Sequence, residues 1–296
     1  MACYYPLKGW RSSERTKTGK RKIVFTLKGA HVDQPVSIPC GSCIGCRLER
    51  SRQWAIRCMH EASLHPDNTV VCLTYDPEHL PQNGSLVKEH FQLFMKRLRK
   101  VFPQKIRYLH CGEYGENLSR PHYHAVLFNC DFTDKEPYKK SKTGHPQWTS
   151  ETLNKTWGKG FCTISSLTFD TAAYVARYIT KKITGDDSIE HYQGKQAEYI
   201  TMSRRPGLAR GWYDKWKDDV YPSDSVVMNG YEIQPPKFYD RILSLDSPAE
   251  YLKLKHKRLA NAPEDWDYEQ SPERLGVKEK VQILNLKGKR SYENEK

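Results

Sequence analysis

Alternating stretches of apolar and polar residues predict a chain in which strands and helices follow one another. Residues 69–75 are rich in β-branched residues and are followed by Asp76-Pro77, which indicates a buried strand closed by a turn. Residues 87–102 carry apolar side chains at helical spacing with basic residues between them, which predicts an amphipathic helix with a cationic exposed face. A similar spacing between residues 48 and 63 predicts another helix.

Two further segments, 106–111 and 123–128, predict the strands of a β-hairpin. The loop between them is rich in Gly, Asn, Ser and Pro, which suit a tight reversal of the chain. Residues 161–167 predict another strand, which is followed by a helix over residues 171–182. The order strand, helix, strand, strand, helix, strand, helix favours an α+β fold with a central, mainly antiparallel sheet over a doubly wound parallel sheet.

Changes in composition along the chain predict three segments. We expect an N-terminal cysteine-rich element with a helix at 1–66, a central domain at 67–245, and a charged C-terminal helix and tail at 246–296. Residues 8–29 are basic with little hydrophobic periodicity, which indicates a basic loop or hairpin. Long charged runs after residue 246 predict a peripheral helix and a loose tail.

The charge balance favours a polyanionic partner. The chain has 48 Lys and Arg against 35 Asp and Glu, a net charge of +13, and 11% aromatic residues. Basic and aromatic residues together suit single-stranded nucleic acid, although charge alone identifies no partner. The sequence lacks both a continuous apolar stretch of membrane-spanning length and the pattern of a signal peptide, so we expect an intracellular protein with no membrane partner.

A candidate metal site lies in the predicted hairpin. Strand alternation places His122 and His124 on one face, with Cβ atoms about 7 Å apart, where two imidazoles can share one ion. Antiparallel pairing can bring Glu113 beside them, with His110 and Glu116 as competitors for the third position. Two histidines and a carboxylate suit Mg²⁺ or Mn²⁺ with a phosphate oxygen, but also the Fe²⁺ of an oxygenase, and histidine pairs are often purely structural.

A second candidate site lies on the helix at 171–182. Tyr174 and Tyr178 are one helical turn apart, so their hydroxyls lie side by side and suggest two successive strand-transfer events. Lys181 falls within roughly 60° of them, with Arg177 and Lys182 on the flanks. Because the pKa of an unperturbed tyrosine is about 10, such cations would favour the phenolate nucleophile. Packing aromatics are the alternative, but a separate apolar face already accounts for burial: Ala172, Val175, Ala176, Ile179 and Ile183.

The cysteines predict a structural metal site in a reducing compartment. The chain has nine cysteines, and three of them form a Cys-x-x-Cys-x-x-Cys motif with Gly in the turns: Cys40, Cys43 and Cys46. This motif can wrap thiolates around Zn²⁺, which needs a fourth ligand, and we expect Cys3 in that position. Cys58 and His60 are alternatives, and an iron–sulfur cluster is also compatible with the motif.

Together these motifs resemble the HUH endonucleases. The resemblance rests on Glu113, on the sequence Arg-Pro-His-Tyr-His at 120–124, and on Tyr-Val-Ala-Arg-Tyr-Ile-Thr-Lys-Lys at 174–182. The chain is more closely similar to the replication initiation proteins of small single-stranded DNA bacteriophages, the Microviridae, of the gokushovirus type. The N-terminal cysteine pattern is also similar to that group, so the resemblance covers roughly residues 1–240.

The resemblance implies a ferredoxin-like fold in which residues 67–245 form the HUH endonuclease catalytic domain. It implies a divalent ion, Mg²⁺ or Mn²⁺, held by His122, His124 and Glu113. It assigns the nucleophile role to Tyr174 and Tyr178. Related initiators carry Lys where this chain has Arg177, so the helper cation is expected at Lys181 or Lys182.

The implied activity is rolling-circle replication. A metal-dependent endonuclease of this type nicks the phage origin, keeps a 5′-phosphotyrosine intermediate, and later rejoins the displaced strand into a circle. We therefore expect single-stranded origin DNA and a host helicase as partners in the host bacterial cytoplasm, with DNA bound near residues 96–100 and the N-terminal basic loop. The alternatives are a non-catalytic, zinc-containing DNA-binding protein and an Fe²⁺ oxygenase on a β-barrel, against which the predicted helices argue.

Overall fold

The computed structural model describes residues 3–17, 19, 21–115, 118–141, 144–177 and 187–294. It divides into two compact units: unit 1, Met1–Glu49 with Ala262–Glu295, and unit 2, mainly Arg50–Asn261. These limits differ from the predicted segments 1–66, 67–245 and 246–296, because the end of the chain joins the N-terminal residues and helix α1 (Ile44–Ala62) runs across the boundary. The assignment of functional domains to the predicted segments stays a prediction.

Unit 2 is built on a seven-stranded sheet in which all neighbouring strands are antiparallel. The strand order is β10-β5-β6-β4-β9-β8-β7. The strands are β4 (Asn68–Leu73), β5 (Arg107–Tyr114), β6 (Pro121–Phe128), β7 (Lys135–Lys140), β8 (Pro146–Ser150), β9 (Cys162–Ser166) and β10 (Tyr199–Met202). The predicted mixed α+β architecture with a mainly antiparallel sheet is confirmed.

Four central strands and two helices follow a β-α-β-β-α-β order along the chain. Helix α2 (Lys88–Val101) connects β4 to β5, the hairpin β5–β6 follows directly, and α3 (Glu151–Trp157) precedes β9. In space these strands lie in the order β5-β6-β4-β9, so each helical connection skips the neighbouring position in the sheet. Strand β10 extends one edge of this central part, and the β7–β8 hairpin extends the other.

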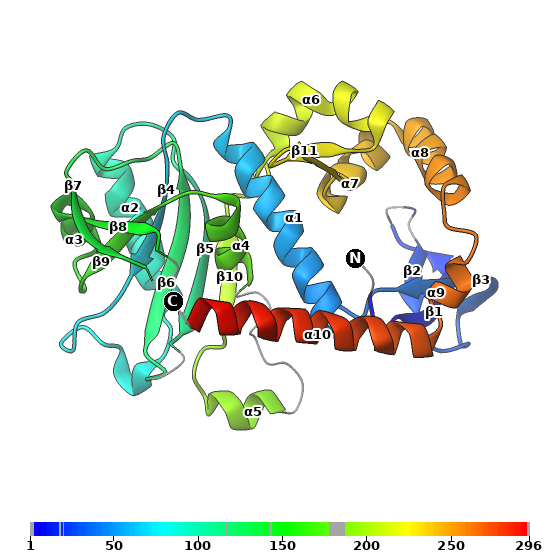
Figure 1. Ribbon diagram of the computed structural model, residues 1–296, viewed down its shortest axis with the longest axis horizontal. Coiled ribbons are helices and arrows are strands. Elements are labelled where there is room, and N and C mark those ends of the chain that lie inside the picture. Colours follow the sequence, from blue (N-terminus) through cyan, green and yellow to red (C-terminus); the bar gives the residue numbers. More distant parts are fainter. Residues whose placement is uncertain are drawn as a thin grey trace. The chain divides into compact units, whose positions relative to one another are not determined.

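Helices cover both faces of the sheet (Figure 1). Helices α2 and α3 pack on one face through Phe91, Phe94, Leu153 and Trp157, among others. Helices α1 and α4 (Phe169–Arg177) cover the opposite face, where small side chains such as Ala55 and Ala172 allow close approach to the strands. The predicted helices at 48–63 and 87–102 correspond to α1 and α2, whereas the helix predicted over 171–182 is described only as far as Arg177.

The remaining elements of unit 2 pack around the end of α1. They are a 3-10 turn (Gln82–Gly84), α5 (Asp187–Tyr192), α6 (Arg210–Ser223), β11 (Val226–Met228), β12 (Tyr231–Ile233), α7 (Lys237–Asp246) and α8 (Pro248–Ala260). His60 of α1 stacks on Trp212 with a centroid separation of 3.5 Å. In α8, the Arg258 guanidinium binds the carboxylates of Asp224 and Asp240, each at 2.7 Å, which ties the charged run to the rest of the unit.

Unit 1 contains a three-stranded antiparallel sheet in the order β2-β1-β3. Its elements are β1 (Leu7–Arg15), β2 (Arg21–Val24), β3 (Ala30–Ile38), the beginning of α1, α9 (Trp266–Glu269) and α10 (Pro272–Asn294). The basic segment predicted as a loop or hairpin thus forms paired strands. The predicted loose tail is instead helical to Asn294, and its first turns are held by ion pairs from Arg274 and Lys278 to Glu269.

The described helices include none that combines the length and the apolar character needed to cross a membrane.

Candidate functional site

The register of the β5–β6 hairpin brings three predicted metal ligands together. Glu113 is paired with His122, and His124 lies two residues further along the same face of β6. Oε1 of Glu113 accepts hydrogen bonds from Nε2 of His122 at 2.6 Å and from Nε2 of His124 at 2.9 Å. The ligand atoms of these residues, here called the Glu-His-His cluster, all lie within 4.8 Å of one another, which suits a single metal ion.

The competitor His110 does not join this cluster. Its ring is stacked on Phe91 with centroids 3.4 Å apart, and its Nδ1 is hydrogen-bonded to the Thr201 hydroxyl at 2.8 Å. Burial, together with the nearby charge of His124, lowers the pKa of His110 well below its usual value, so the ring is neutral at pH 7. His110 is therefore part of the packing, and the other competitor, Glu116, lies outside the described residues.

The charges within the cluster stabilise one another. Burial favours the neutral form of Glu113, but hydrogen bonds from His122 and His124 outweigh it and lower the pKa of this carboxyl. Burial likewise opposes the charge on His124, but the thiolate of Cys72 and the carboxylate of Glu113 raise the pKa of His124 to about 10. The cluster therefore carries a proton on His124 at neutral pH when no ion is bound.

Cys72 is a residue of this site that the sequence analysis did not identify. It lies on β4, directly opposite His124 in the register of the two strands. Burial alone would raise the pKa of the Cys72 thiol, but the charge and the hydrogen bond of His124 lower it. Only the pairing of β4 with β6 reveals the contact, because nothing in the spacing of Cys72 along the chain connects it with the histidines.

Tyr174 lies at the edge of the Glu-His-His cluster. Its ring centroid is 5.5 Å from that of His124, and the two rings are nearly perpendicular, at 88°. The side chain is 46% exposed, so its hydroxyl remains within reach of a large substrate. The structure thus brings one predicted nucleophile together with the predicted metal ligands, while Tyr178, Lys181 and Lys182 lie outside the described residues.

Packing and capping fix the position of helix α4. The predicted apolar face is buried against the sheet through Ala172, Val175 and Ala176. At the beginning of the helix, the Thr168 hydroxyl accepts a hydrogen bond from the Thr171 amide at 3.1 Å, and the Thr171 hydroxyl accepts one from the Thr168 amide at 2.8 Å. This reciprocal cap and the buried face orient Tyr174 toward β6.

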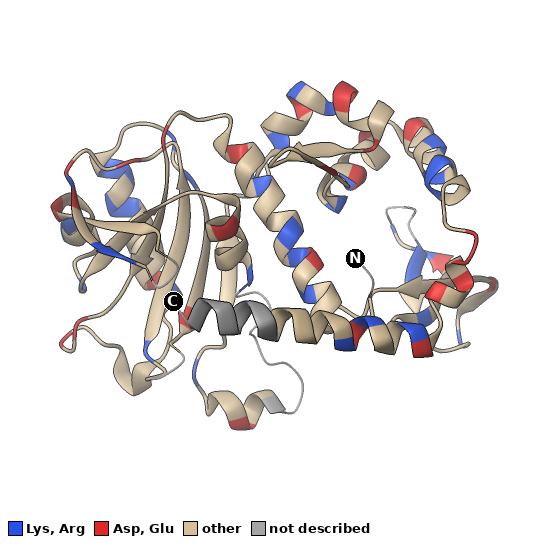
Figure 2. Ribbon diagram, viewed as in Figure 1, with Lys and Arg blue, Asp and Glu red and all other residues tan. Residues whose placement is uncertain are grey.

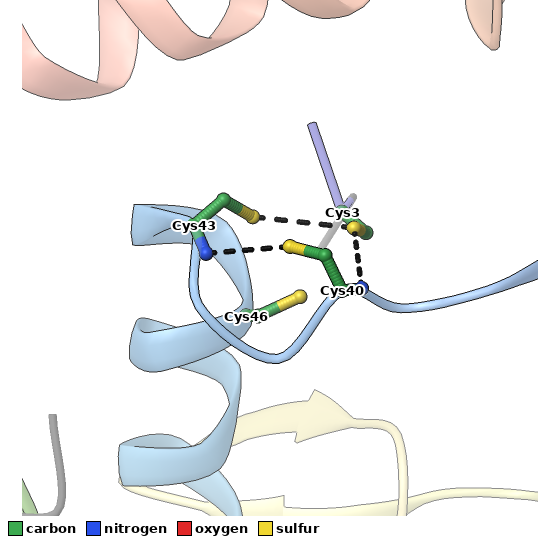
Figure 3. Close-up of side chains that lie close together, drawn as sticks. All are labelled: Cys3, Cys40, Cys43 and Cys46. Carbon is green, nitrogen blue, oxygen red and sulfur yellow. Dashed lines mark hydrogen bonds between the residues drawn. The ribbon is translucent and has the colours of Figure 1, made fainter. Parts of the chain in front are cut away.

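A second group of candidate metal ligands lies in unit 1 (Figure 3). Cys3 precedes β1, Cys40 and Cys43 lie in the loop before α1, and Cys46 is in the first turn of α1. Their four sulfur atoms lie within 4.8 Å of one another. Backbone amides point at the sulfurs: Cys40 donates to Sγ of Cys3 at 3.2 Å, and Cys43 donates to Sγ of Cys40 at 3.3 Å. The structure thus places Cys3 with the other three cysteines.

The local environment favours one thiolate in this cysteine cluster. Burial opposes ionisation of Cys40, but amide hydrogen bonds, the first from Cys43, and the Ser42 hydroxyl lower its pKa to about 6. Burial raises the pKa of Cys46 to about 12, so a bound metal must displace protons from the cluster. The alternative ligands Cys58 and His60 instead belong to unit 2, where Cys58 is fully buried and His60 bonds to the Tyr239 hydroxyl at 2.7 Å.

Comparison with known proteins identifies the family. Residues 68–183 match the sequence model of the replication-associated protein ORF2 family, a range that extends from β4 through the Glu-His-His cluster to α4 and beyond. Replication-associated protein ORF2 of Spiroplasma virus 4 is 37% identical over 243 residues, which cover 76% of this chain and 74% of that protein. Replication-associated protein VP4 of Bdellovibrio phage phiMH2K is 31% identical over 277 residues, covering 88% and 84%.

A third relative is replication-associated protein ORF4 of Chlamydia phage 1, with 30% identity over 267 residues, 84% of this chain and 66% of that protein. No solved structure matches the chain. Two of these relatives exceed 30% identity and are matched over more than two thirds of their length. The chain therefore belongs to the replication-associated protein family of small bacteriophages, the Microviridae, and is a phage replication initiator.

Proposed function

We propose that the protein initiates rolling-circle replication by nicking single-stranded DNA at the phage origin with a tyrosine nucleophile. The observation that carries this proposal is the contact between Tyr174 and His124, because it joins a candidate nucleophile to a candidate metal site. The β-α-β-β-α-β order, with strands in the order β5-β6-β4-β9, supports a ferredoxin-like HUH endonuclease fold for the central segment 67–245.

The Glu-His-His cluster fits a divalent cation, Mg²⁺ or Mn²⁺. Two imidazole nitrogens and a carboxylate oxygen occupy one side of the site, and such a set leaves coordination positions open for a phosphate oxygen. A bound ion would stabilise the negative charge that develops on the scissile phosphate. His122 and His124 would then each turn a nitrogen from Glu113 toward the ion, and Glu113 would neutralise part of its charge.

Tyr174 is the proposed attacking group. Its phenolic oxygen forms a bond to phosphorus while the bond from phosphorus to the 3′ oxygen breaks, and the proton lost by the phenol is balanced by the one gained by the leaving 3′-hydroxyl. That hydroxyl primes replication, and the protein stays on the 5′-phosphate. We assign the second attack to Tyr178, after which the free 3′-hydroxyl attacks the first phosphotyrosine and closes a circle. Lys181 or Lys182 would favour the phenolate.

The test of this function is a covalent adduct. The protein is incubated with single-stranded oligonucleotides that tile the phage genome, with Mn²⁺ or Mg²⁺ and with EDTA as the control. We expect one oligonucleotide to give a metal-dependent protein–DNA band that survives denaturing electrophoresis. If the folded protein forms no adduct with any oligonucleotide, the enzyme assignment is wrong, and the alternative of a non-catalytic, zinc-containing DNA-binding protein is favoured.

Metal binding to the Glu-His-His cluster is expected to release a proton. Since the pKa of His124 is raised to about 10, its ring is protonated at pH 7, whereas a metal ion requires the neutral ring. The apparent affinity for Mn²⁺ should therefore rise as pH rises, by about tenfold per pH unit up to the pKa of His124. Isothermal titration calorimetry in two buffers of different ionisation enthalpy measures this proton, and buffer-independent heats would contradict it.

We also propose that the cysteine cluster holds a structural Zn²⁺ ion. Four sulfurs within 4.8 Å of one another, two of which accept amide hydrogen bonds, match the closed tetrahedral coordination of structural zinc.

A Cys43→Ser variant should accordingly lose its zinc, from about one equivalent per chain to nearly none, and unfold more easily, because structural zinc contributes folding energy. Metal analysis by mass spectrometry measures this. The control is Cys130→Ser, which changes a buried thiol of the unit 2 core and should retain zinc. Iron in the purified wild type, with the absorption of an iron–sulfur cluster, would show the zinc assignment to be wrong.

The proposed setting follows from this activity. We place the protein in the cytoplasm of the host bacterium, where single-stranded origin DNA is its substrate and a host helicase with the replication machinery unwinds the parental duplex. The substrate would be held through cationic side chains, including those of the α2 segment 96–100, because phosphate contacts supply most of the affinity of such proteins for DNA.

A further inference from the structure

Cationic residues are spread over both units and are interspersed with acidic ones (Figure 2). Overall charge therefore does not locate a DNA-binding surface, and a local imbalance is needed. Such an imbalance occurs at a pocket of about 850 Å³ in unit 2. The pocket is formed by the end of α2, the loop that leads into β5, the first residues of β5, and the segment that follows β10.

Four exposed cations line this pocket: Arg99, Lys105, Arg204 and Arg205. None of the described residues that line the pocket is Asp or Glu. Within the described part of the chain, these four side chains form no ion pair. The fifth lining cation, Arg107, is buried and forms an ion pair with Glu61. The four exposed cations concentrate positive charge that a bound anion would neutralise.

Hydrogen bonds hold the segment with Arg204 and Arg205 in place. The Tyr108 amide donates to the Ser203 hydroxyl at 3.1 Å, and the Ser203 amide donates to the Tyr108 carbonyl at 2.9 Å. The guanidinium of Arg107 donates to the Pro206 carbonyl at 2.9 Å. The backbone on both sides of the two arginines is therefore fixed to β5. A pre-positioned pair of cations binds an anion with less entropic loss than a mobile pair does.

The lining also includes partly buried apolar side chains. Tyr108 and Met202 present an aromatic ring and a thioether beside the cations. Single-stranded DNA offers both phosphates, which need cations, and bases, which pack on aromatic and apolar surfaces. The combination fits a nucleic-acid strand better than it fits a small inorganic anion.

The pocket lies at the opposite end of β5 from the Glu-His-His cluster. Arg107 is paired with Phe128 at one end of the hairpin, and Glu113 is paired with His122 toward the other. The two positions are separated by about 20 Å, given a rise of about 3.3 Å per residue along a strand. At about 3.4 Å per nucleotide, this distance corresponds to about six nucleotides of stacked DNA.

We propose that this basic pocket is a second DNA-binding site, which holds the backbone of the origin strand about six nucleotides from the nick. The distance to the nick rests on the proposed nicking function, whereas backbone binding by the pocket does not. The pocket would keep the strand in place while the phosphodiester at the Glu-His-His cluster is broken, and would make its contribution to affinity without touching the reacting atoms.

The test compares the salt dependence of DNA binding. Fluorescence anisotropy with labelled oligo(dT), long enough to span both sites, measures affinity in EDTA, so that no cleavage occurs. The Arg204→Gln, Arg205→Gln variant should show a slope of log K against log salt that is smaller in magnitude by about 1.4, since each lost contact to single-stranded DNA removes about 0.7. Lys217→Gln with Arg241→Gln removes the same charge from exposed positions of α6 and α7 and should change the slope by less than half as much.

Further arms separate the possible failures. Lys105→Gln, in the exposed loop, should lower the slope by about 0.7 and confirms that the effect does not come from misfolding of the segment after β10. An unchanged slope in both pocket variants would overturn the proposal, even if the wild type forms covalent adducts. Loss of dTTP binding with an unchanged oligo(dT) slope would show that the pocket binds a free nucleotide instead. With saturating DNA, the pocket variants should nick at the wild-type rate and differ only in KM.

Discussion

The Tyr174→Phe, Tyr178→Phe double variant is expected to form no covalent adduct with origin DNA, a loss on the order of a thousandfold or more in nicking rate. Phenylalanine preserves the shape of both side chains but has no oxygen that could attack phosphorus. Tyr174 is exposed and α4 is anchored by its opposite face, so removal of this hydroxyl should not unfold the protein. Denaturing electrophoresis of labelled DNA measures the adduct, and binding to oligo(dT) in EDTA should remain as in the wild type.

The single variants distinguish the two tyrosines. Because Tyr174 contacts His124, Tyr174→Phe should abolish the first nick, whereas Tyr178→Phe should allow the first nick but prevent closure of the circle. A matched control is Tyr231→Phe, which alters an exposed tyrosine of β12 and should retain both steps. Full adduct formation by the double variant would mean that another residue is the nucleophile. First-nick activity in Tyr174→Phe that is lost in Tyr178→Phe would reverse the order.

The His124→Ala variant is expected to lower the nicking rate by about a hundredfold or more, which corresponds to several kcal/mol of charge stabilisation by the metal. It removes one imidazole ligand and one of the hydrogen bonds to Glu113. His122→Ala should have the same effect and provides a second variant in case the more buried His124 is needed for folding. A gel assay over a series of Mn²⁺ concentrations measures the loss and any rescue at high metal concentration.

Two controls limit the interpretation of the histidine variants. His79→Ala removes an exposed histidine that contacts Asp76 outside the Glu-His-His cluster and should nick as the wild type does. Binding to oligo(dT) in EDTA should survive in both His→Ala variants, since phosphate contacts made elsewhere supply most of the affinity. Normal nicking in both would show that the catalytic metal is not bound here.

Much of the site could be predicted because its parts obey simple periodicities. Alternation along one strand places His122 and His124 on the same face, and the hairpin brings Glu113 opposite them. Cys72 could not be predicted in the same way. Its contact with His124 depends on which strand of the sheet lies beside β6 and in which register, and neither is written in the local pattern of β4.

Parts of the fold were missed for a different reason. All six residues of β7 are exposed, so this edge strand has no apolar alternation that could reveal it. Helix α3 has only seven residues and is short for recognition by its periodicity, although it buries Trp157. The helical end of the chain was predicted as a tail because its charged residues suggested solvation, whereas ion pairs to Glu269 hold its first turns. Cys3 was accessible to prediction because zinc requires a fourth ligand.

The single oxygen of Glu113 that accepts from both histidines bears on what happens when the ion leaves. Buried polar groups are costly when they lose their partners, but here Glu113 Oε1 can replace the ion as the partner of His122 and His124. The hairpin is thus self-supporting, and its ion can exchange freely between rounds of replication. The cysteine cluster has only weak thiol contacts to substitute for an ion, so its metal is a permanent part of the fold, and a chelator should silence one site long before it dismantles the other.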